Sequence, residues 1–333
     1  MRNPDIAIDV ECADAFARPA DVLALKYAQY GYGVDRAAAT RLTLDDDRLP
    51  AVGEHLVVQS RGRLLARTVL FLGVPPIEDF DYRDIRSIGE RALTVAAAEC
   101  PEARDIVMTI HGPGFGLDEA EAFESQLAGV FDALTARTMP AALRSVVFVD
   151  RDERRAERLR AALRRIVPSH SVSARSPFAT PGIASRTARH LRSVGYDTSQ
   201  KERAFVAMPF ADEFIDVFHF GIADPIRRTG LICERMDEVQ FVGDVVAKMT
   251  SKIADARVVV ADLTGANPNV YLEVGYAWGR NVPTVLLCRD SDEVKFDVQG
   301  HRCLRYKNIK DLADQLGDTL TALVGPAVVQ RGA

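Results

Sequence analysis

The chain has 333 residues, of which 47% are hydrophobic and 27% charged, and its formal net charge is −5. This length is typical of two domains and this composition of a folded globular protein, and the slight acidic excess excludes a general attraction to nucleic acid or anionic membranes. No apolar run reaches the roughly 18 residues needed to span a bilayer, and the acid-interrupted N-terminus does not predict a signal peptide. We therefore expect a cytoplasmic protein with no membrane partner and no nucleic-acid partner.

The cysteines and histidines show no spacing that builds a metal site or a redox motif. None of the five cysteines stands in a C-x-x-C pattern, and the six histidines lack metal-ligand spacing. An odd number of scattered cysteines is typical of reduced thiols rather than of a disulfide framework. We expect no metal, and no cofactor as a prosthetic group.

The first block of the chain alternates apolar runs with helical patterns. Five runs have the near-continuous apolar character of strands in a sheet covered on both faces, namely 22–28, 55–60, 66–74, 105–110 and 145–150. Apolar residues at helical spacing predict two helices, 119–137 and 152–166. We take residues 1–167 as the first domain.

The composition changes between residues 168 and 202, where serine, proline and glycine are frequent and hydrophobic periodicity is lost. Such a composition is typical of a linker. Residues 151–203 carry 13 Lys and Arg against 5 Asp and Glu, so this region is locally basic. The plainer interpretation is a solvated helix face with a tether. The alternative is a contact strip for an acidic partner or nucleic acid, although aromatic residues for base stacking are not interleaved.

The second block, residues 203–333, returns to a regular strand–helix rhythm. The predicted strands are 203–209, 231–236, 257–263, 283–288 and 303–307, and the predicted helices are 212–230, 243–256, 268–280 and 309–324. Strands separated by helices imply a parallel sheet with right-handed crossovers. Ligands of such sheets bind outside the carboxyl ends of the strands, so we expect the site in the loops that follow them.

Three of these loops carry the candidate substrate-binding residues. The candidates are Met208, Pro209, Phe210, Phe241, Gly243, Asp244, Thr264, Asn267 and Asn269. Asn267 followed by Pro268 suits the N-cap and first position of a helix. Asp262 ends an otherwise apolar strand, where an acid is costly unless it has a role. Either it contacts substrate or it caps the next turn.

Glu273 is the candidate reactive residue. It falls near the start of the helix 268–280, between Leu272 and Val274 and close to the expected crevice. Partial burial there would raise its pKa. A carboxylate so placed can act as a nucleophile, or can stabilise a cationic centre when a bond at an anomeric carbon breaks. Periodicity alone favours the plainer alternative, an exposed glutamate paired with a neighbouring cation.

The segment AFVAMPF, followed after about fifty residues by VVVADLTGANPNVYLEVGYAWGRNVPTVLL, resembles the nucleoside 2-deoxyribosyltransferase and N-hydrolase superfamily, and also the TIR-like domains of bacterial defence proteins. The resemblance covers about residues 203–305. It implies that Glu273 attacks or stabilises the anomeric carbon, that Asp262 handles a substrate hydroxyl or a proton, and that the Met208–Phe210 loop helps to form the pocket. Phe210 stands where the transferases have a tyrosine. Hydrolysis of a nucleotide, including the nicotinamide–ribose bond of NAD, is therefore favoured over deoxyribosyl transfer.

Two glycine loops follow strands in the first domain, Gly31–Asp35 and His111–Gly116. Glycines at such a place let the backbone approach a phosphate, and a helix N-terminus favours an anion. Asp118 and Glu121 make a plausible capping box for the helix after the second loop. Either loop taken alone is more typical of a tight turn.

Together the loops resemble a macro domain, the ADP-ribose-binding fold, or its relative at the front of leucine aminopeptidases, over about residues 5–167. Asp14, followed seven residues later by Asp21 and Val22, matches the adenine-binding aspartate and the strand after it. The ligand-binding residues that this resemblance implies are Asp14, Gly31, Gly33, Val34, Asp35, Gly112, Gly114, Phe115 and Gly116. Lys26–Gln29 stand where many macro domains have asparagines, so a sensor is favoured over macro-type hydrolysis. Acids after the second loop would oppose a diphosphate unless they point away, and these are Asp118, Glu119 and Glu121.

The resulting hypothesis is a ligand-regulated N-glycosidase effector in prokaryotic antiviral defence. Its fold class is α/β, with a macro-like mixed sheet followed by a flavodoxin-like or TIR-like parallel sheet, each in three layers. An ADP-ribose-type ligand would bind to the first domain, and NAD or another nucleotide would be the substrate of the second domain. The chain would form a homo-oligomer. Two alternatives stay open: a non-enzymatic nucleotide-sensing module, and a constitutive nucleoside deoxyribosyltransferase or hydrolase.

Overall fold

The computed structural model describes the chain except for residues 1–4, 30–32, 78, 113–115, 237–244 and 326–333. The chain forms two compact units. The first unit comprises Met1–Pro113 and Glu119–Ser199, and the second comprises Gly114–Asp118 and Gln200–Ala333. The units are described separately below.

The first unit is built on a mixed sheet. Its strands are β1 (Ile6–Cys12), β2 (Ala20–Tyr27), β3 (His55–Gln59), β4 (Ala66–Gly73), β5 (Asp105–Thr109), β6 (Ser145–Asp150) and β7 (Ser171–Val172). They lie in the order β3-β4-β2-β5-β6-β1-β7. The five central strands are parallel, whereas β3 and β7 run antiparallel to their neighbours at the two edges. The expected mixed α/β sheet is confirmed.

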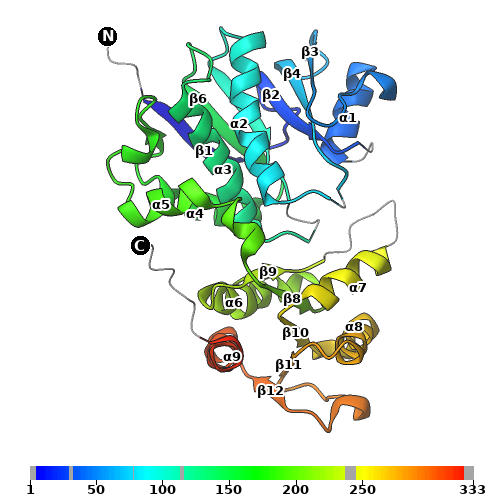
Figure 1. Cartoon of the computed structure of the whole chain (residues 1–333). Helices are drawn as coiled ribbons and strands as arrows, with labels where there is room; N and C mark the ends of the chain where they lie inside the picture. Colours follow the sequence, from blue (N-terminus) through cyan, green and yellow to red (C-terminus); the bar gives the residue numbers. More distant parts are fainter. Residues whose placement is uncertain (1–4, 30–32, 78, 113–115, 237–244, 326–333) are drawn as a thin grey trace. The chain divides into compact units, whose positions relative to one another are not determined.

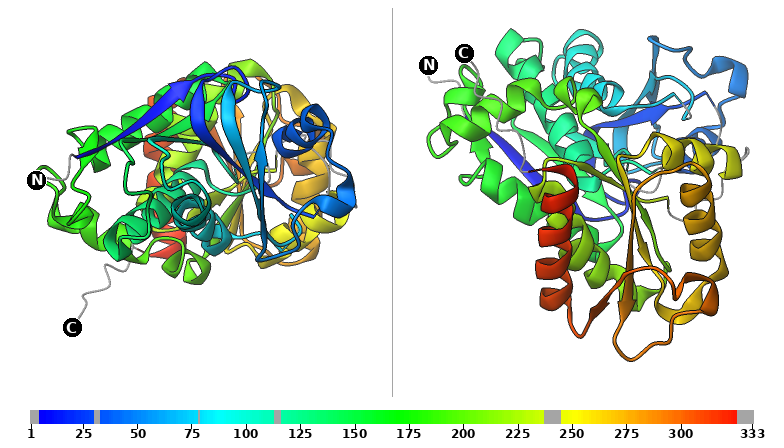
Figure 2. Two further views of the ribbon diagram at one scale, coloured as in Figure 1. Left: turned by 90° about the horizontal axis from the view of Figure 1, so that it is seen from above. Right: turned by 60° about the horizontal axis from the view of Figure 1, so that its bottom comes forward.

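Helices cover both faces of this sheet (Figures 1 and 2). They are α1 (Gly33–Leu42), α2 (Tyr82–Glu99), α3 (Glu119–Ala136), α4 (Glu153–Ile166) and α5 (Ser185–Ser193). On one face, the buried side of α1 packs on Leu23, Leu25 and Phe71. Because side chains alternate along a strand, the intervening residues of β2 face the opposite layer, where α2 and α3 lie side by side (Figure 1).

Two glycines set the distance between α2 and α3. A Cβ on Gly89 would lie 2.1 Å from the carbonyl oxygen of Gln126, and a Cβ on Gly129 would lie 1.8 Å from that of Arg86. No side chain larger than hydrogen fits at either position. The close crossing of these helices therefore depends on both glycines.

Outside the segment 168–202, one strand and two α-helices of the first unit escaped the sequence patterns, namely β1, α1 and α2. In β1, burial alternates, with Ile6, Ile8 and Val10 inside and residues between them more exposed. Alternation is a weaker signal than a continuous apolar run over so short a segment. The buried face of α1 consists of Asp35, Ala38, Ala39 and Leu42, so it offers only one large apolar side chain and little contrast in hydrophobicity.

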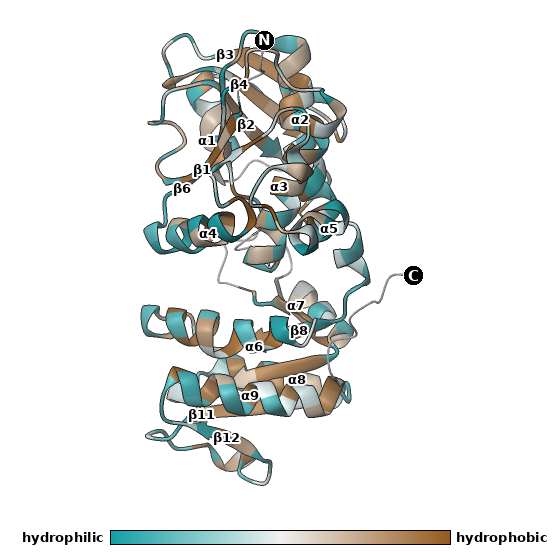
Figure 3. Cartoon of the chain, turned by 90° about the vertical axis from the view of Figure 1, so that its left-hand side faces the viewer, coloured by the Kyte–Doolittle hydropathy of each residue, from teal (hydrophilic) through white to brown (hydrophobic). Residues whose placement is uncertain are grey.

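The segment 168–202 is folded, in contrast to the linker that its composition suggested. Strand β7 extends the sheet by pairing antiparallel with β1. Helix α5 buries Ala188 and Leu191, and Val194 at its end is also buried. So few apolar residues over so many positions leave no visible periodicity, although they suffice to attach the segment to the first unit. Most residues of the adjacent helix α4 are hydrophilic (Figure 3).

The second unit is built on a parallel sheet. Its strands are β8 (Arg203–Ala207), β9 (Ile232–Glu234), β10 (Val258–Asp262), β11 (Thr284–Arg289) and β12 (Cys303–Tyr306). Their order is β12-β11-β10-β8-β9, and every pairing is parallel. This is the flavodoxin-like order, in which the first strand lies between the second and the third. The expected parallel sheet is confirmed.

Helical elements cover the two faces of the second sheet. They are η5, a π-helix (Val217–Ala223), α6 (Asp224–Arg228), α7 (Val245–Asp255), α8 (Pro268–Gly279) and α9 (Ile309–Val324). One core joins η5, α6 and α9 to one face, and a second core joins α7 and α8 to the other. The right-hand view of Figure 2 shows α8 and α9 on opposite sides of the strands.

The single helix expected over 212–230 is divided into a short 3-10 turn (Asp212–Phe214), η5 and α6. Pro225 has no amide hydrogen to donate, so a regular α-helix cannot continue through it unchanged. Gly221 allows close packing, since a Cβ there would lie 2.7 Å from a methyl carbon of Leu312 on α9. No helix in the described parts of the chain is long and apolar enough to cross a membrane.

Candidate functional site

Each sheet has a topological switch point, where the chain connections after two neighbouring strands diverge toward opposite edges of the sheet. In the first unit, the connection after β2 proceeds toward β4 and the one after β5 proceeds toward β6, so the switch lies between β2 and β5. In the second unit it lies between β8 and β10. Ligands of open α/β sheets bind outside the carboxyl ends of the strands at these points.

Three ionisable side chains are buried at the switch point of the first unit. Lys26 from β2 is 6% exposed, and Asp35 from α1 and His111 after β5 are each 2% exposed. The Nζ of Lys26 lies 3.9 Å from Oδ2 of Asp35, which is an ion pair without a hydrogen bond. Burial lowers the pKa of Lys26 and raises that of Asp35, and in each case the charge of the partner opposes the shift. We call Lys26, Asp35 and His111 the buried triad.

Polar atoms around the triad lack hydrogen-bond partners among the described residues. They are Oδ2 of Asp35, Nε2 of His111 and Oγ1 of Thr109. Burial and the nearby charge of Lys26 hold the pKa of His111 well below its usual range, so its ring is neutral. An unsatisfied buried polar group costs about 1–3 kcal/mol. Such a concentration of buried polar atoms without hydrogen bonds at one end of a sheet is typical of a place completed by a ligand or by water.

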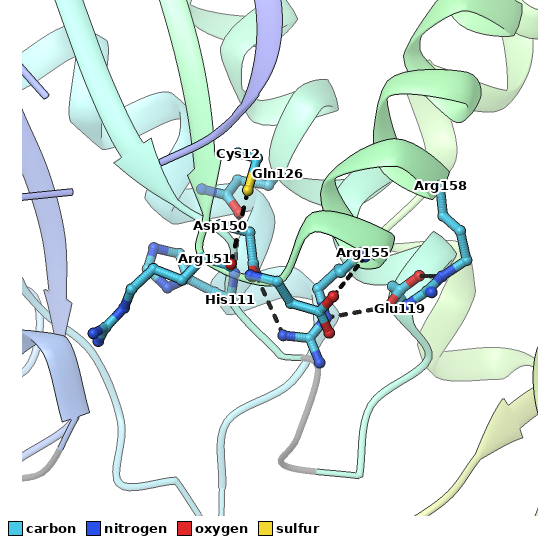
Figure 4. Close-up of polar contacts among 9 residues, drawn as sticks. Cys12, His111, Glu119, Gln126, Asp150, Arg151, Arg155 and Arg158 are labelled. Carbon is cyan, nitrogen blue, oxygen red and sulfur yellow. Dashed lines mark hydrogen bonds and ion pairs between the residues drawn. The ribbon is translucent and has the colours of Figure 1, made fainter. Parts of the chain in front are cut away.

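Gln126 holds the end of β5 in position. Its side chain on α3 is fully buried; the amide donates to the carbonyl oxygen of Thr109 at 3.0 Å and its oxygen accepts from the backbone N–H of His111 at 3.4 Å. Figure 4 shows His111 and Gln126 at this end of the sheet. Sequence patterns did not single out Lys26 or His111 as site residues. The available signal was a lysine inside an apolar strand, where a charge is costly to bury.

The described macro-type candidates lie at the carboxyl edge of the first sheet. Asp14 follows β1, and its Oδ1 accepts from the backbone N–H of Phe16 at 2.8 Å. Gly33 opens α1 with a φ of +72°, and Gly112 follows β5 with a φ of +101°. Both angles favour glycine. Val34 is half-buried, whereas Gly31, Gly114 and Phe115 lie outside the described residues.

The acids that follow the second glycine loop are all paired. Glu119 accepts hydrogen bonds from Arg155 at 3.2 Å and from Arg158 at 2.8 and 2.9 Å, and both arginines extend from α4 (Figure 4). Glu121 accepts from the hydroxyl of Thr198 at 2.9 Å. Within the second unit, Asp118 accepts from Nε of Arg227 at 2.9 Å, and Gly116 of the same segment has a φ of +80°. The charges of Glu119 and Asp118 are therefore balanced by arginines, whereas the Glu121 contact to Thr198 is to a neutral hydroxyl.

In the second unit, Glu273 occupies the second turn of α8. Its side chain is half-buried, and this burial raises its pKa to about 7. No hydrogen bond or ion pair joins it to another residue in the described part of the chain. The alternative of an exposed, ion-paired glutamate is therefore not what the structure contains.

The position of α8 is fixed by its first turn and by its buried face. The side-chain oxygen of Asn267 accepts from the backbone N–H of Asn269 at 2.9 Å, and Pro268 occupies the first turn. Val270, Val274 and Ala277 are buried against the sheet. Asn267 thus caps the helix, as its sequence pattern indicated. Glu273 lies on the flank of this buried face, near the end of the helix that meets the carboxyl edge.

Asp262 is completely buried, and both of its oxygens are engaged. Oδ1 accepts from the N–H of Thr264 at 3.0 Å and from its hydroxyl at 2.6 Å. Oδ2 accepts from the hydroxyl of Tyr306 at 2.8 Å. Burial and the charge of Asp262 raise the pKa of Tyr306 well above its usual range. These contacts match the turn-capping alternative, and sequence patterns had not singled out Tyr306.

The loop after β8 supplies the other described candidates. Met208 and Pro209 are buried, whereas Phe210 is 38% exposed. Arg235, which follows β9, lies against Met208 and Phe210. Phe241, Gly243 and Asp244 lie outside the described residues. The strand order therefore brings the Met208–Phe210 loop and the Asp262–Asn269 segment to one edge of the sheet.

Among the described residues, this edge provides a carboxyl group whose pKa is near neutral. Within the described ranges, no group of three or more His, Cys, Asp or Glu side chains could hold a metal ion. The carboxyl group of Glu273, with a pKa of about 7, is half ionised at pH 7. It can therefore serve as a nucleophile or as a proton donor.

The chain matches no protein-family model and no curated protein. Among solved structures it is similar to a macrodomain of Trypanosoma brucei, with 18% identity over 47% of this chain and 67% of that chain and a TM-score of 0.40. It is similar to a macrodomain of Oceanobacillus iheyensis with ADP, with 15% identity over 50% of this chain and 95% of that chain and a TM-score of 0.40. It is also similar to the macro domain of ganglioside induced differentiation associated protein 2, with 12% identity over 49% of this chain and 84% of that chain and a TM-score of 0.38.

Proposed function

We propose that the second unit is an N-glycosidase that hydrolyses a nucleotide such as NAD, with Glu273 as its catalytic residue. The observation that carries the proposal is a half-buried carboxyl group with a pKa of about 7 at the ligand-binding edge of a parallel sheet. Carboxyl groups that are strongly desolvated cluster at functional sites. The sequence around it, DLTGANPNVYLEVGYAWG, resembles that of enzymes acting at anomeric carbons.

In the proposed reaction, an ionised Glu273 oxygen attacks the anomeric carbon as the bond from that carbon to the base nitrogen breaks. The bond's electron pair leaves with the base, and water then hydrolyses the resulting ester to free the sugar. Nicotinamide bound through its ring nitrogen is cationic and departs as a neutral molecule, so this step requires no proton donor. A step that needs no proton donor fits this site, because the other candidate acid, Asp262, is already hydrogen-bonded to Tyr306 and Thr264.

Asp262 then acts as a positioning residue. It fixes Thr264 at the beginning of the segment that leads from β10 to α8, and so it fixes the start of the helix that carries Glu273. The candidate substrate-binding residues Thr264, Asn267 and Asn269 lie in the same segment, between the end of β10 and the first turn of α8. We place the substrate's ribose and base against this segment and the Met208–Phe210 loop.

For the first unit we propose binding of an ADP-ribose-type ligand that regulates the second unit. The buried triad and its unpartnered atoms at the β2–β5 switch point support the placement of this ligand. Asp14, Gly33 and Gly112 lie at the same edge of the sheet. We further propose that the protein acts in the cytoplasm as an antiviral effector and that it works as a homo-oligomer.

The test is product analysis of the full chain with NAD and a panel of nucleosides and nucleotides, with and without ADP-ribose. The comparison variant is Glu273→Gln, and Glu293→Gln, an exposed glutamate in the same unit, serves as a matched control. Release of nicotinamide or another base by the wild type and the control, but not by Glu273→Gln, is the expected result. Dependence on ADP-ribose supports regulation by the first unit.

Two other functions give different results in the same experiment. A nucleotide-sensing module without enzymatic activity would bind ligands and release no base from any substrate. A constitutive transferase or hydrolase would process deoxynucleosides at the same rate whether or not ADP-ribose is added.

A further inference from the structure

Positive charge is concentrated in residues 158–196 of the first unit. This segment contains eight arginines and no lysine, aspartate or glutamate, so its formal charge is +8, whereas that of the whole chain is −5. It extends from the middle of α4 through β7 to the residues just after α5. Exposed charges act mainly within about 8–10 Å at physiological salt, so this local excess, rather than the net charge, decides which partner approaches the surface.

The chain between α4 and α5 folds back, so that the end of one helix comes near the start of the other. A Cβ placed on Gly182 would lie 3.8 Å from a ring carbon of Pro168. Pro168 stands just after Arg165 in the last turn of α4, and Gly182 stands just before Arg186 in the first turn of α5. Both helices are mostly hydrophilic (Figure 3). The arginines of the two helices are therefore brought to neighbouring parts of one surface.

The guanidinium groups of five exposed arginines in this segment form no hydrogen bond and no ion pair with any residue that the structure describes. We call these five the arginine strip: Arg164, Arg165, Arg175, Arg186 and Arg189. Other arginines of the first unit are used within the fold, as Arg158 is by its hydrogen bonds to Glu119. Unpaired charges of one sign repel each other, and an anionic ligand that lies across them removes this repulsion.

The start of α5 also favours an anion. Its N-cap is Ala184, which has no side-chain oxygen to accept hydrogen bonds from the amides of the first turn. Helix N-termini of this kind attract phosphate through their amides and the helix dipole. Ser185 adds an exposed residue with a hydroxyl in the same turn, and hydroxyls are frequent phosphate contacts. Amide, hydroxyl and guanidinium donors therefore occur together at this helix.

An exposed aromatic ring favours a nucleic acid over an acidic peptide as the partner. Tyr196 stands shortly after the end of α5 and is 52% exposed. The guanidinium of Arg86 lies over its ring, with Cζ 4.5 Å from the ring centroid, and is itself held by Asp132 at 2.7 and 2.8 Å. The ring is therefore oriented by the protein and still half exposed. A nucleic-acid base can stack on such a ring, whereas an acidic peptide has no group that requires it.

We propose that the arginine strip binds the phosphate backbone of a single-stranded nucleic acid and that a base of this strand stacks on Tyr196. The planar fork of a guanidinium binds two phosphate oxygens at once. Because backbone phosphates carry no sequence information, the binding is independent of sequence. It uses the first unit alone, so it does not depend on the N-glycosidase activity proposed for the second unit.

The experiment measures binding of the full chain to a fluorescent RNA of about 20 nucleotides, longer than the roughly 4–16 that one binding site covers. Fluorescence anisotropy gives Kd at several salt concentrations. The strip variant removes one arginine from each helix, Arg164→Gln with Arg189→Gln. The control variant, Arg48→Gln with Arg61→Gln, removes the same charge from exposed arginines elsewhere in the first unit.

The salt dependence of Kd reports the number of phosphates that are bound. Each phosphate contact of a single strand contributes about 0.7 to the slope of log Kd against log salt, so we expect a slope of about 3.5 for the wild type and about 2 for the strip variant. At about 50 mM salt the strip variant should bind about 10- to 100-fold more weakly. The control variant should stay within about twofold of the wild type, since charges far from the strand are screened.

Replacement of the aromatic ring tests the stacking separately. Tyr196→Leu should weaken binding by about 5-fold or more, because stacking of one base on an aromatic ring is worth about 1–3 kcal/mol. The salt slope should stay as in the wild type, since stacking releases no counterions. Unchanged affinity of this variant would overturn the assignment to a single strand.

Three other results would overturn the inference as a whole. The wild type might fail to bind the RNA at about 100 μM protein and 50 mM salt, where even non-specific binding is measurable. The strip and control variants could lose affinity equally, which would reflect net charge and not this surface. Finally, polyglutamate of equal total charge could displace the labelled RNA as effectively as unlabelled RNA does, which would make an acidic peptide the partner.

Discussion

The hydroxyl of Tyr306, at the end of the last strand of the second sheet, donates a 2.8 Å hydrogen bond to Oδ2 of Asp262, at the end of the central strand β10. The intervening strand, β11, joins the same network, because the N–H of Arg289 donates to the hydroxyl of Thr264 at 2.9 Å. A buried carboxylate is thereby satisfied entirely by groups of the protein. The segment that leads to Glu273 starts from this network.

Removal of the Tyr306 hydroxyl should destabilise the second unit. Tyr306→Phe leaves one oxygen of a completely buried carboxylate without a partner, which typically costs about 1–3 kcal/mol. Urea unfolding measures the loss. Tyr271→Phe is the control, because that hydroxyl makes a 3.3 Å contact in an exposed setting and its loss should cost no more than about 0.5 kcal/mol. Equal effects of the two variants would contradict the importance assigned to the network.

The raised pKa of Glu273 predicts how stability depends on pH. The folded chain holds this proton up to a pH of about 7, whereas the unfolded chain releases it near 4.5. The unfolding free energy should therefore fall as pH rises from about 4.5 to 7, by up to about 3 kcal/mol before solvent screening. In Glu273→Gln this component should vanish, so the variant should exceed the wild type in stability at pH 8. Parallel urea titrations at pH 5 and pH 8 test this, and identical pH profiles would refute it.

The same ionisation predicts the pH dependence of catalysis. A nucleophilic or charge-stabilising Glu273 must be ionised, so kcat/KM for the cleaved nucleotide should rise through a pH of about 7 and level off above it. Initial rates between pH 5.5 and pH 8.5 provide the measurement. A rate that falls through the same range would indicate that the protonated form is the active one, and would assign the carboxyl group as a proton donor.

The helix crossing in the first unit should tolerate no added methyl group. In Gly129→Ala the new Cβ would lie 1.8 Å from the carbonyl oxygen of Arg86, so α2 and α3 would have to separate. We expect a loss of about 3 kcal/mol or more. Gly275→Ala in α8 is the opposite case: its Cβ would meet nothing within 4 Å, and the better helix propensity of alanine should stabilise by about 0.5–1 kcal/mol. Thermal unfolding of the two variants should therefore shift in opposite directions.

The buried triad should behave as an interdependent pair of charges with a neutral histidine. Lys26→Met removes the cation beside Asp35, and Asp35→Asn removes the anion beside Lys26; each should cost about 3 kcal/mol or more. The double variant should recover most of the loss, because it removes both charges together. A double-mutant cycle in urea measures the coupling. Additive losses would show that the two charges do not stabilise each other.

Much of the fold follows from local patterns in the sequence. Continuous apolar runs separated by helical stripes indicated parallel α/β sheets, and the Asn267–Pro268 pair identified the start of α8. Local signals failed where few apolar residues carry an element. The alanine-rich α1 and the segment 168–202 bury only small or widely spaced side chains, so neither gave a visible period. The prediction of one continuous helix over 212–230 was wrong. The close packing of Gly221 on Leu312 involves α9, about ninety residues later, and local patterns do not show it.

The sequence by itself determined which loops would meet, because parallel strands bring their carboxyl ends to one edge of a sheet whatever their exact packing. It also made Glu273 the candidate reactive residue, through its position and the resemblance of the surrounding motif. Only the tertiary structure decided the environments: desolvation that raises the pKa of Glu273, the bonds from Tyr306 and Thr264 that occupy Asp262, and the burial of Lys26 beside Asp35. The reason is physical. Burial and pairing depend on groups distant in the chain, and no local pattern of residues records which of them will be neighbours.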